Sequence, residues 1–459
     1  MSAIDAAETS GTPSSNGKIE SIPDDILALF AGYGFAESGV ASTIAFSHVC
    51  RSFRGAVMDQ ALLWTELSST FHIDQVRACI ERSGNAGLNV QLVAREVENY
   101  KPEEIHAFLL AVLPSSTRWE TFSIQSPPRI MWEDKYAIVQ LLRDARGLCS
   151  GLDLPRLKSL QLEYNLKGLI DVPGATTFTS WSFSPSLREI YAINFIIPPS
   201  SITSNITSLN LHYSEKRLSL ARDLLAFLSS TQSLQKLSMR FHSLDIDLHR
   251  GALPQISLRH LDHFLLRLSA NPLHADLSLL AVQVFVRAIS MPNLKSHSIS
   301  LEFPGNCVDR LEHFGQQVSN LIPNPATHLQ LKSFNFAVFI TSGSHGRDCS
   351  FPLQFTFPLR KIPQVERLAF ASNIQFEFSS QEVSSVGRSV IPSLPHLKHL
   401  TLTCPRMSGG GLFDLVERLE DVGMWEGLEE MQFVGCNALK SREIFKIIDT
   451  REKRVEIAV

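Results

Sequence analysis

The sequence predicts a mixed α/β protein in which short strands alternate with amphipathic helices over most of the chain. Three observations support this fold class. A pattern of three apolar residues, spaced apolar-x-x-apolar-x-apolar, recurs from about residue 116 onward, and helices with one apolar face lie between several copies. The first 64 residues lack the pattern and contain short helical stretches instead. Strands that follow one another through helices form parallel neighbours with right-handed crossovers.

The clearest copy of the pattern is Leu157-x-x-Leu160-x-Leu162. The copies begin at Trp119, Leu157, Leu187, Ile206, Leu234, Leu258, Leu294, Leu331, Val365, Leu397 and Leu428. In the copies that begin at Leu187 and Leu258 the third apolar residue is one position late, at Ile193 and Phe264. In the copy that begins at Leu294, His297 takes the second core position. The mean step of about 31 residues is close to the 20–29 residues of leucine-rich repeats.

Amphipathic helices are predicted at Leu218–Leu228, Val308–Leu321 and Leu412–Val422, where apolar residues recur at i, i+3 or i+4. One strand and one helix cannot bury their apolar faces alone, but stacked copies bury them continuously. This part therefore resembles an irregular leucine-rich-repeat solenoid, with parallel strands on its concave face and helices on its convex face. A doubly wound α/β domain is the alternative, which the many copies and the lack of a glycine-rich βα turn disfavour.

The remaining segments complete the predicted organisation. Residues 1–17 are rich in Ser, Thr and Gly and are expected to be a disordered tail. Residues 18–68 form a small helical domain. Residues 69–115 connect it through helices at Asp74–Ser83 and Lys101–Leu113 and a first strand at Leu88–Leu92. Residues 116–459 form the repeat array, with Ala438–Val459 as a terminal helix and strand that cover its end. Loops are predicted at Asp171–Ser182, Thr341–Ser350 and Gly409–Gly411.

The helical domain begins with a helix-start signal, because Pro23 suits a first turn and the two aspartates after it complement the helix dipole. Ile22, Ile26, Leu27 and Phe30 follow at helical spacing. We expect the helix to break at Gly32-Tyr33-Gly34, before a second apolar run that extends to Phe53. A domain this small cannot enclose a core of its own. It therefore requires a surface on which to dock.

Three blocks of this domain resemble an F-box: Ile22–Leu27, Ser47–Arg54 and Leu63-Trp64. The departures are Ile22, Asp25 and Tyr33-Gly34-Phe35, and the resemblance covers about a tenth of the chain. F-boxes are often joined to leucine-rich repeats. The resemblance implies a non-catalytic substrate-recognition subunit of an SCF-type cullin ubiquitin ligase, which binds the Skp-type adaptor and, through it, the cullin. The residues that it assigns to the adaptor interface or its support are Ile22, Pro23, Ile26, Leu27, Val49, Cys50 and Trp64.

In the repeats, the residues that flank the second and third apolar positions point away from the core. The candidate target-binding residues at such positions are Gln161, Tyr191, Asn210, Arg240, Asp262, Arg367 and His399. These side chains are polar and carry both signs of charge. Together with a net charge of −4, they give no indication of a nucleic-acid partner.

Other functions have less support in the sequence. The alternative is a leucine-rich-repeat protein-binding scaffold outside any ligase, whose helical domain packs as a cap near Leu88. Solvent protection of Ile26 and Leu27 would favour that alternative. No nucleophile, phosphate-loop or metal motif is present, since His396 and His399 point to opposite faces of a strand. We therefore expect no catalysis, metal or cofactor. The seven cysteines form no disulfide framework, and we find neither a secretory leader nor a long apolar run. We therefore expect no membrane partner and a location in the cytoplasm or nucleus.

Overall fold

The computed structural model describes residues 22–93, 101–125, 145, 147–149, 151–163, 184–195, 204–214, 220–242, 252–269, 275–304, 321–322, 328–341, 355–358, 362, 364–373, 376–379, 396–405, 407, 409–421, 423–436, 439, 442 and 454–458. The chain divides into two compact units, unit 1 at Met1–Gln91 and unit 2 at Leu92–Val459. The division lies within the segment 69–115 that the sequence predicts to be a connection.

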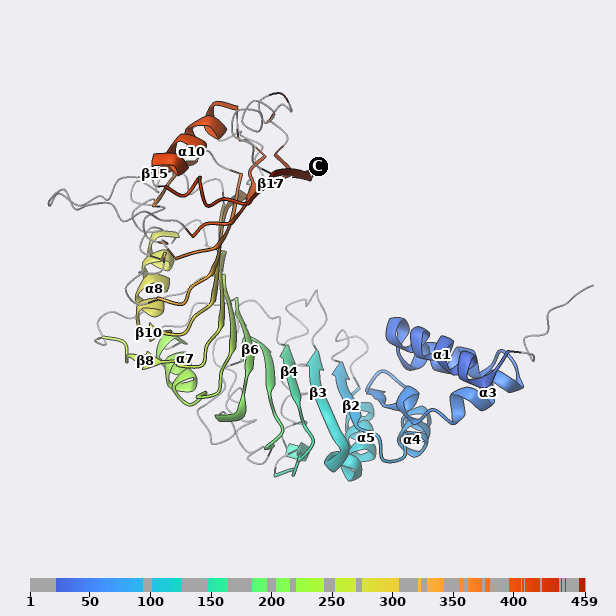
Figure 1. Cartoon of the computed structure of the whole chain (residues 1–459). Helices are drawn as coiled ribbons and strands as arrows, with labels where there is room; N and C mark the ends of the chain where they lie inside the picture. The colour runs from blue at the N-terminus through green and yellow to red at the C-terminus, as the bar shows by residue number, and fades with distance from the viewer. Residues whose placement is uncertain are drawn as a thin grey trace, which may run out of the picture. The chain divides into compact units, whose positions relative to one another are not determined.

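Unit 1 is mainly helical (Figure 1, blue). Its elements are α1 (Asp24–Ser38), α2 (Val40–Ser47), α3 (Arg51–Met58), η2 (Ala61–Trp64), β1 (Glu66–Ser68), α4 (Ile73–Arg82) and β2 (Leu88–Val93), the last of which crosses the division. β1 and β2 pair in parallel, with Leu67 opposite Val90. The predicted helix start at Pro23 is confirmed, because its carbonyl accepts the first hydrogen bonds of α1, from the N–H groups of Ile26 and Leu27.

The expected break at Gly32-Tyr33-Gly34 is wrong, because α1 continues to Ser38. Gly34 has a packing role there, since a Cβ at this position would lie 2.5 Å from the Phe46 ring of α2. The chain turns instead at Gly39, which has φ +60°, a conformation that glycine adopts without strain. The second apolar run is likewise two helices, α2 and α3, separated at His48–Cys50.

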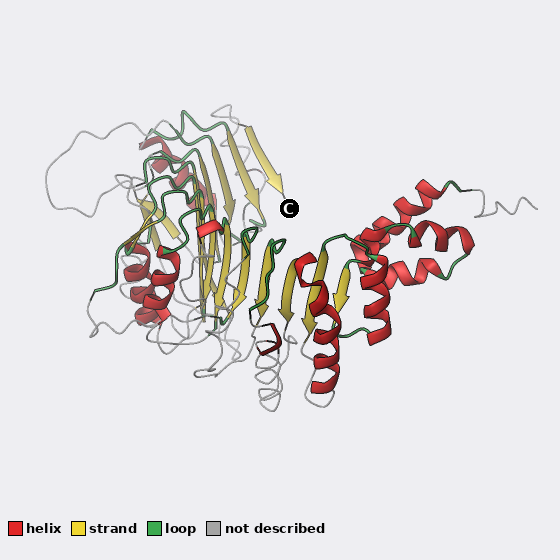
Figure 2. Cartoon of the chain, turned by 90° about the horizontal axis from the view of Figure 1, so that it is seen from below, coloured by secondary structure: helices red, strands yellow, loops and turns green. Residues whose placement is uncertain are grey.

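Unit 2 is built on an open parallel sheet (Figure 2, yellow strands). Its strands lie in the order β3-β4-β5-β6-β7-β9-β11-β12-β14-β16-β17-β18, which is their order in the chain. These strands are β3 (Trp119–Gln125), β4 (Ser159–Glu163), β5 (Glu189–Ile193), β6 (Ser208–Tyr213), β7 (Lys236–Phe241), β9 (His263–Ser269), β11 (Ser296–Pro304), β12 (Ser333–Thr341), β14 (Arg367–Ser372), β16 (His399–Thr403), β17 (Glu430–Val434) and β18 (Arg454–Ala458). The predicted mixed α/β class with parallel strands is confirmed. A doubly wound domain would reverse the order at a switch point, which the described strands do not do.

The recurring apolar pattern places its second and third residues in two buried rows across the sheet. Leu160, Ile190 and Leu209 are successive partners in the first row, and Leu162 and Leu211 belong to the second. Each strand of the array therefore presents the same positions to the core, as the pattern predicts.

The predicted register is wrong in two copies of the apolar pattern. Ala192, not Ile193, fills the third apolar position on β5, although Ile193 is also buried. β9 begins at His263, so Phe264 and Leu266 take the core positions and Leu258 lies before the strand. The reason is that the residues just before Leu258, Ile256–Ser257, form the short strand β8. His297 does lie in a core position and is 1% exposed.

The helices of the described part are α5 (Pro102–Val112), η4 (Leu113–Arg118), α7 (Leu220–Ser229), α8 (Ala275–Arg287) and α10 (Gly409–Asp421), with small pairs of strands β8 (Ile256–Ser257) with β10 (Ile289–Ser290) and β13 (Phe355–Pro358) with β15 (Phe376–Ser379). α7 and α8 lie on the same face of the sheet (Figure 1). α8 was not predicted. α10 begins at Gly409, where a loop was expected.

Several predicted elements lie outside the described residues, namely the tail at 1–17, the loop at Asp171–Ser182 and nearly all of the helix Val308–Leu321 and of the loop Thr341–Ser350. Of that last loop, only Thr341 is described, and it ends β12 rather than starting a loop. The helix predicted within Ala438–Val459 also lies largely outside them, whereas the terminal strand is present as β18 and pairs in parallel with β17.

Candidate functional site

The outer side of α1 carries four large apolar side chains that remain exposed in the described part of the chain. Ile26 is 39% exposed, Leu29 56%, Phe30 55% and Tyr33 68%. Their spacing of i, i+3, i+4 and i+7 puts them on one stripe of the helix, which we call the α1 stripe. The opposite side of α1 buries Leu27 and Ala31 completely. α1 is thus apolar on two sides, although only one of them faces the core of unit 1.

The seven residues assigned to adaptor binding separate into three groups in the structure. Leu27 and Trp64 are buried, at 0% and 1% exposure. Ile22 and Cys50 are half-buried and pack against the core cluster that contains Leu27. Pro23, Ile26 and Val49 are exposed. Of the seven, only this last group is free for a partner, and the other four support its position.

Sequence reasoning did not assign Leu29 and Tyr33 to the candidate site, although both lie on the α1 stripe. Phe30 was placed on the apolar face of the helix but was left out of the assigned residues. The i, i+3, i+4 and i+7 spacing of these apolar residues was the signal that could have identified them. It was missed because two glycines at Gly32 and Gly34 suggested that the helix ends before its third turn.

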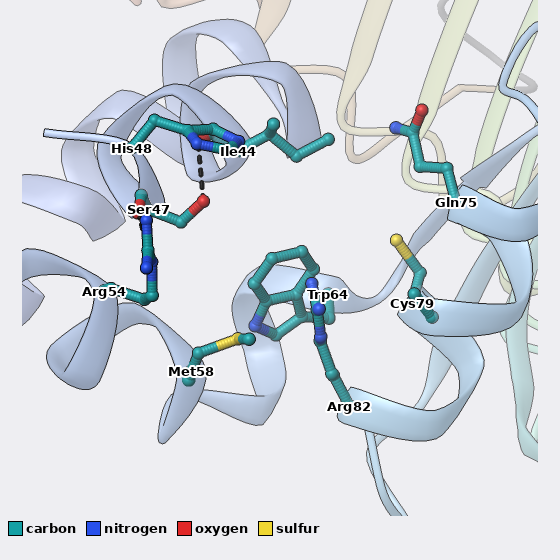
Figure 3. A pocket seen from close by; sticks show the side chains of 10 residues that line it. Ile44, Ser47, His48, Arg54, Met58, Trp64, Gln75, Cys79 and Arg82 are labelled. Atoms are coloured by element: carbon teal, nitrogen blue, oxygen red, sulfur yellow. Dashed lines mark hydrogen bonds between the residues drawn. The ribbon is translucent and has the colours of Figure 1, made fainter. Parts of the chain in front are cut away.

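Unit 1 also contains a cavity of about 340 Å³ between its helices (Figure 3). It is lined by Ile44, Ser47, His48, Arg54, Met58, Trp64, Gln75, Ala78, Cys79 and Arg82. Arg54 donates from Nε to the Ser47 carbonyl oxygen at 2.9 Å, and the Ser47 hydroxyl donates to the Ile44 carbonyl at 2.7 Å. The Arg54 bond ties α3 to the end of α2, beside the exposed Val49.

Trp64 forms one wall of this cavity and fixes η2 to α3. Its indole Nε1 donates to the Val57 carbonyl oxygen at 3.1 Å, and the Arg82 guanidinium carbon lies 4.4 Å from the ring centroid. Cys79 lies beside them, and burial raises the pKa of its thiol to about 11. A thiol with such a pKa is protonated at neutral pH and is not a nucleophile. The cavity is therefore a structural element of the helical unit.

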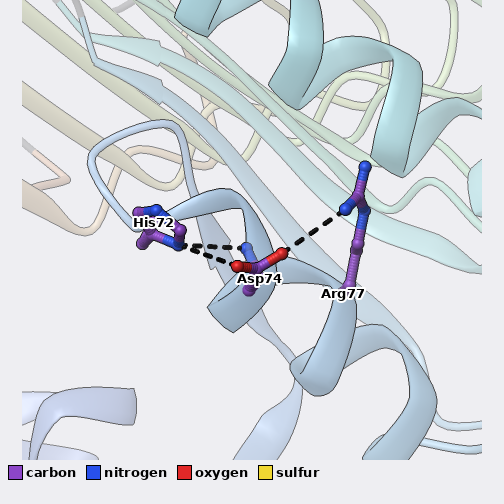
Figure 4. A network of polar contacts seen from close by, with 3 residues as sticks. All are labelled: His72, Asp74 and Arg77. Carbon is purple, nitrogen blue, oxygen red and sulfur yellow. Dashed lines mark hydrogen bonds and ion pairs between the residues drawn. The ribbon is translucent and has the colours of Figure 1, made fainter.

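The start of α4 is held by a small polar network (Figure 4). The His72 Nδ1 accepts a hydrogen bond from the Asp74 N–H at 3.3 Å, and the Asp74 carboxylate lies 3.4 Å from the Arg77 guanidinium. All three side chains are mostly exposed, and such contacts contribute little to stability.

In unit 2, three of the predicted target-binding residues form one group on the solvent face of the sheet. Tyr191 is the register partner of Gln161 on one side and of Asn210 on the other. Gln161 donates from Nε2 to Glu163 at 2.9 Å. Burial, followed by the nearby Glu163 charge, raises the pKa of the Tyr191 hydroxyl, so it remains a donor across the physiological range.

Arg367 and His399 form a second group, as register partners on β14 and β16. The His399 ring is paired with Glu430 at 3.1 Å. Asp262 does not lie on a strand, contrary to the prediction, because β9 begins one residue later. Its carboxylate forms an ion pair with Lys295 at 3.0 Å. Similar ion pairs at or next to the first residues of strands are Lys158–Glu120, Lys332–Glu366 and Lys398–Glu429.

Among the described residues, no group of three His, Cys, Asp or Glu side chains is arranged to hold a metal ion. Within the same part of the chain, no helix has the length and apolar character needed to span a bilayer. The family models compared with the sequence include none that matches it, and the search of curated proteins finds no match either, so the resemblance to F-box proteins rests on the residues quoted above.

Proposed function

We propose that the protein is a substrate-recognition subunit of an SCF-type ubiquitin ligase. In this proposal unit 1 is an F-box that docks on the Skp-type adaptor, and unit 2, an irregular leucine-rich-repeat solenoid, holds the target protein. The protein does no bond chemistry itself. It raises the local concentration of target lysines beside the ubiquitin-charged enzyme, which is a proximity effect.

The observation that carries the proposal is the unequal distribution of exposed apolar side chains. Of the large apolar side chains that are most exposed in the described part, seven lie in unit 1 and four in unit 2. Those of unit 1 are Ile26, Leu29, Phe30, Tyr33, Val49, Met58 and Leu62. Exposed apolar patches mark interaction sites. A helix with a second apolar side is expected when a partner helix covers that side.

The α1 stripe allows a test that leaves the core of unit 1 intact. Leu29 and Phe30 are both a little more than half exposed. Full burial of such a side chain is worth about 1.5–3 kcal/mol, so covering the exposed half of each contributes about 1 kcal/mol or more. Leu29→Ala with Phe30→Ala is expected to weaken adaptor binding by about 30-fold or more. Titration of the purified full chain with the adaptor, followed by calorimetry, measures this change.

A matched control lies in unit 2. Leu110 is 51% exposed and Phe413 43% exposed, so Leu110→Ala with Phe413→Ala removes the same side chains from equally exposed positions. This pair is expected to leave the affinity unchanged. Equal affinities for both double variants, or no adaptor binding by the unaltered chain, would refute the docking assignment. Leu27→Ala is unsuitable, because truncating this buried residue unfolds the core that supports the stripe.

The scaffold alternative differs in what covers α1. Protection of Ile26 and Leu27 by the chain itself would favour the scaffold, and the two residues divide, since Leu27 is buried and Ile26 is 39% exposed. Exposure of Ile26 favours docking on another protein. Within the ligase proposal, affinity purification with and without residues 18–68 separates the two functions, since cullin subunits are recovered only if unit 1 recruits them.

A further inference from the structure

The solvent face of two neighbouring strands, β7 and β9, carries four basic side chains in two rows. Lys236 is the register partner of His263, and Arg240 is the partner of Arg267. Lys236 and Arg240 alternate with buried residues along β7, as His263 and Arg267 do along β9. All four therefore point away from the core. We call these four residues the β7–β9 basic group.

Two of these charges are not neutralised. None of the ion pairs within the described ranges includes Arg240 or Arg267. The carboxylates on nearby strands have other partners, since Glu163 accepts from Gln161 and Glu302 accepts from the Ser269 hydroxyl at 2.8 Å. Arg240 Nε is also buried without a hydrogen-bond partner, as is Nε2 of the neighbouring His212. Unsatisfied polar atoms of this kind are costly and unusual in a folded protein.

His212 extends the row of Arg240 and Arg267 onto β6. Its ring stacks at a tilt on His242, with centroids 5.1 Å apart. Burial and the positive surroundings lower the pKa of His212 to about 4. The imidazole is thus neutral at physiological pH, and the positive charge of this row comes from the two arginines.

The size of the basic group indicates what it can bind. Adjacent strands are about 4.8 Å apart, and residues four apart along a strand are separated by about 13 Å. The row of Lys236 and His263 is therefore too far from the arginines for one small anion to contact both. An extended peptide with several carboxylates spans such a distance. Ser238 and Leu265, which are register partners between the two rows, offer a polar and an apolar contact to its middle.

We propose that the β7–β9 basic group binds an acidic peptide segment, rich in Asp or Glu, of a partner protein. The inference rests on the part of the proposed function in which unit 2 holds a target. It does not depend on adaptor docking. The arginine pair supplies forked donors for two carboxylates, and the lysine row extends the site along the strands.

Fluorescence anisotropy with the full chain and labelled ten-residue peptides tests the proposal. The probe alternates Glu with Ser, and its twin replaces every Glu by Gln. The Glu peptide is expected to bind at least tenfold more tightly than the Gln twin and to weaken as NaCl is raised. Arg240→Gln with Arg267→Gln should weaken it by about tenfold, and Arg267→Gln alone, at an exposed position, by about threefold.

The matched control is Arg287→Gln, an exposed arginine of unit 2 in the last turn of α8, which has no assigned role in binding. It is expected to change the affinity less than twofold. Equal effects of the Arg287 and Arg267 substitutions, or equal binding of the Glu and Gln peptides, would overturn the site. A peptide with a single phosphoserine in a Gln background that binds more tightly than the Glu peptide would also overturn the choice of ligand. Adaptor titration of the arginine variants separates the outcomes, because failure of this site leaves adaptor docking unchanged.

Discussion

His297 gives the most direct test of how unit 2 is packed. The side chain is 1% exposed, and neither ring nitrogen has a hydrogen-bond partner among the described residues. The ring stacks on Phe264 with centroids 5.0 Å apart and meets Phe334 edge-on at 5.7 Å. Burial in this aromatic ladder, followed by the nearby His328, lowers the pKa of His297 from 6.5 to about 3. The folded state therefore holds the neutral imidazole.

The sign of the pH dependence follows from this lowered pKa. Between pH 6.5 and about 3, the unfolded chain binds a proton at His297 that the folded chain does not, so stability falls as the pH falls. Each pH unit corresponds to about 1.4 kcal/mol. At pH 4.5, two units below the unfolded value, His297 alone should lower the free energy of unfolding by about 2.7 kcal/mol relative to pH 7.5.

The perturbation is His297→Leu, because β7 and β14, two strands away on either side, carry Leu237 and Leu368 in the same buried row. At pH 7.5 the substitution should change the free energy of unfolding by less than about 1.5 kcal/mol, since removing two unpartnered nitrogens offsets the lost ring contacts. The variant should, however, lose about 2.7 kcal/mol less than the wild type between pH 7.5 and pH 4.5. Urea unfolding followed by circular dichroism at both pH values measures the difference.

His396→Leu is the control, because His396 is exposed on the same unit and its removal should leave the pH dependence unchanged. The pKa of His328 is also lowered by burial, so some acid sensitivity remains in every variant. The reasoning is refuted if His297→Leu and the wild type lose the same stability on acidification. That result would mean that water or a polar partner reaches the ring.

Two further predictions concern unit 1. Gly39→Ala should destabilise the helical unit by more than about 1 kcal/mol, since φ is +60° and the added Cβ would meet the Glu66 carboxylate that accepts from the Val40 N–H; thermal melting measures this, and an unchanged midpoint would contradict it. In native protein at pH 8, iodoacetamide should label the half-buried Cys50 well before Cys79, whose pKa is raised to about 11 by burial; peptide mass spectrometry gives the order, and equal rates would show that α4 is not packed as described.

Much of unit 2 could be predicted from sequence, because its core positions recur at fixed offsets. Leu160, Leu209 and Leu237 are where the pattern places them, and the parallel pairing follows from the helices between strands. The errors on β5 and β9 have different causes. On β5 the pattern cannot tell which of two neighbouring apolar residues, Ala192 or Ile193, takes the core position. On β9 the apolar residues Leu258, Leu261 and Phe264 recur every three positions, so the predicted copy starts three residues too early.

The candidate site in unit 1 was only partly predictable. The helix start at Pro23 and the buried Trp64 were recognised from residue type and position. The α1 stripe was not, since two glycines inside the helix outweighed its apolar spacing. Gly34 is explained only by a contact distant in sequence, the approach of the Phe46 ring. Local sequence contains no information about such a contact.

The strand order of unit 2 has a consequence for how the length of the array can change during evolution. Because each inner strand bonds only to its neighbours along the order β3 to β18, no pairing among the described strands joins distant parts of the array. Duplication or loss of one strand with its connecting segment would therefore disturb two junctions and leave the others as they are. Such a chain can lengthen or shorten its binding face by whole units while its helical unit stays constant.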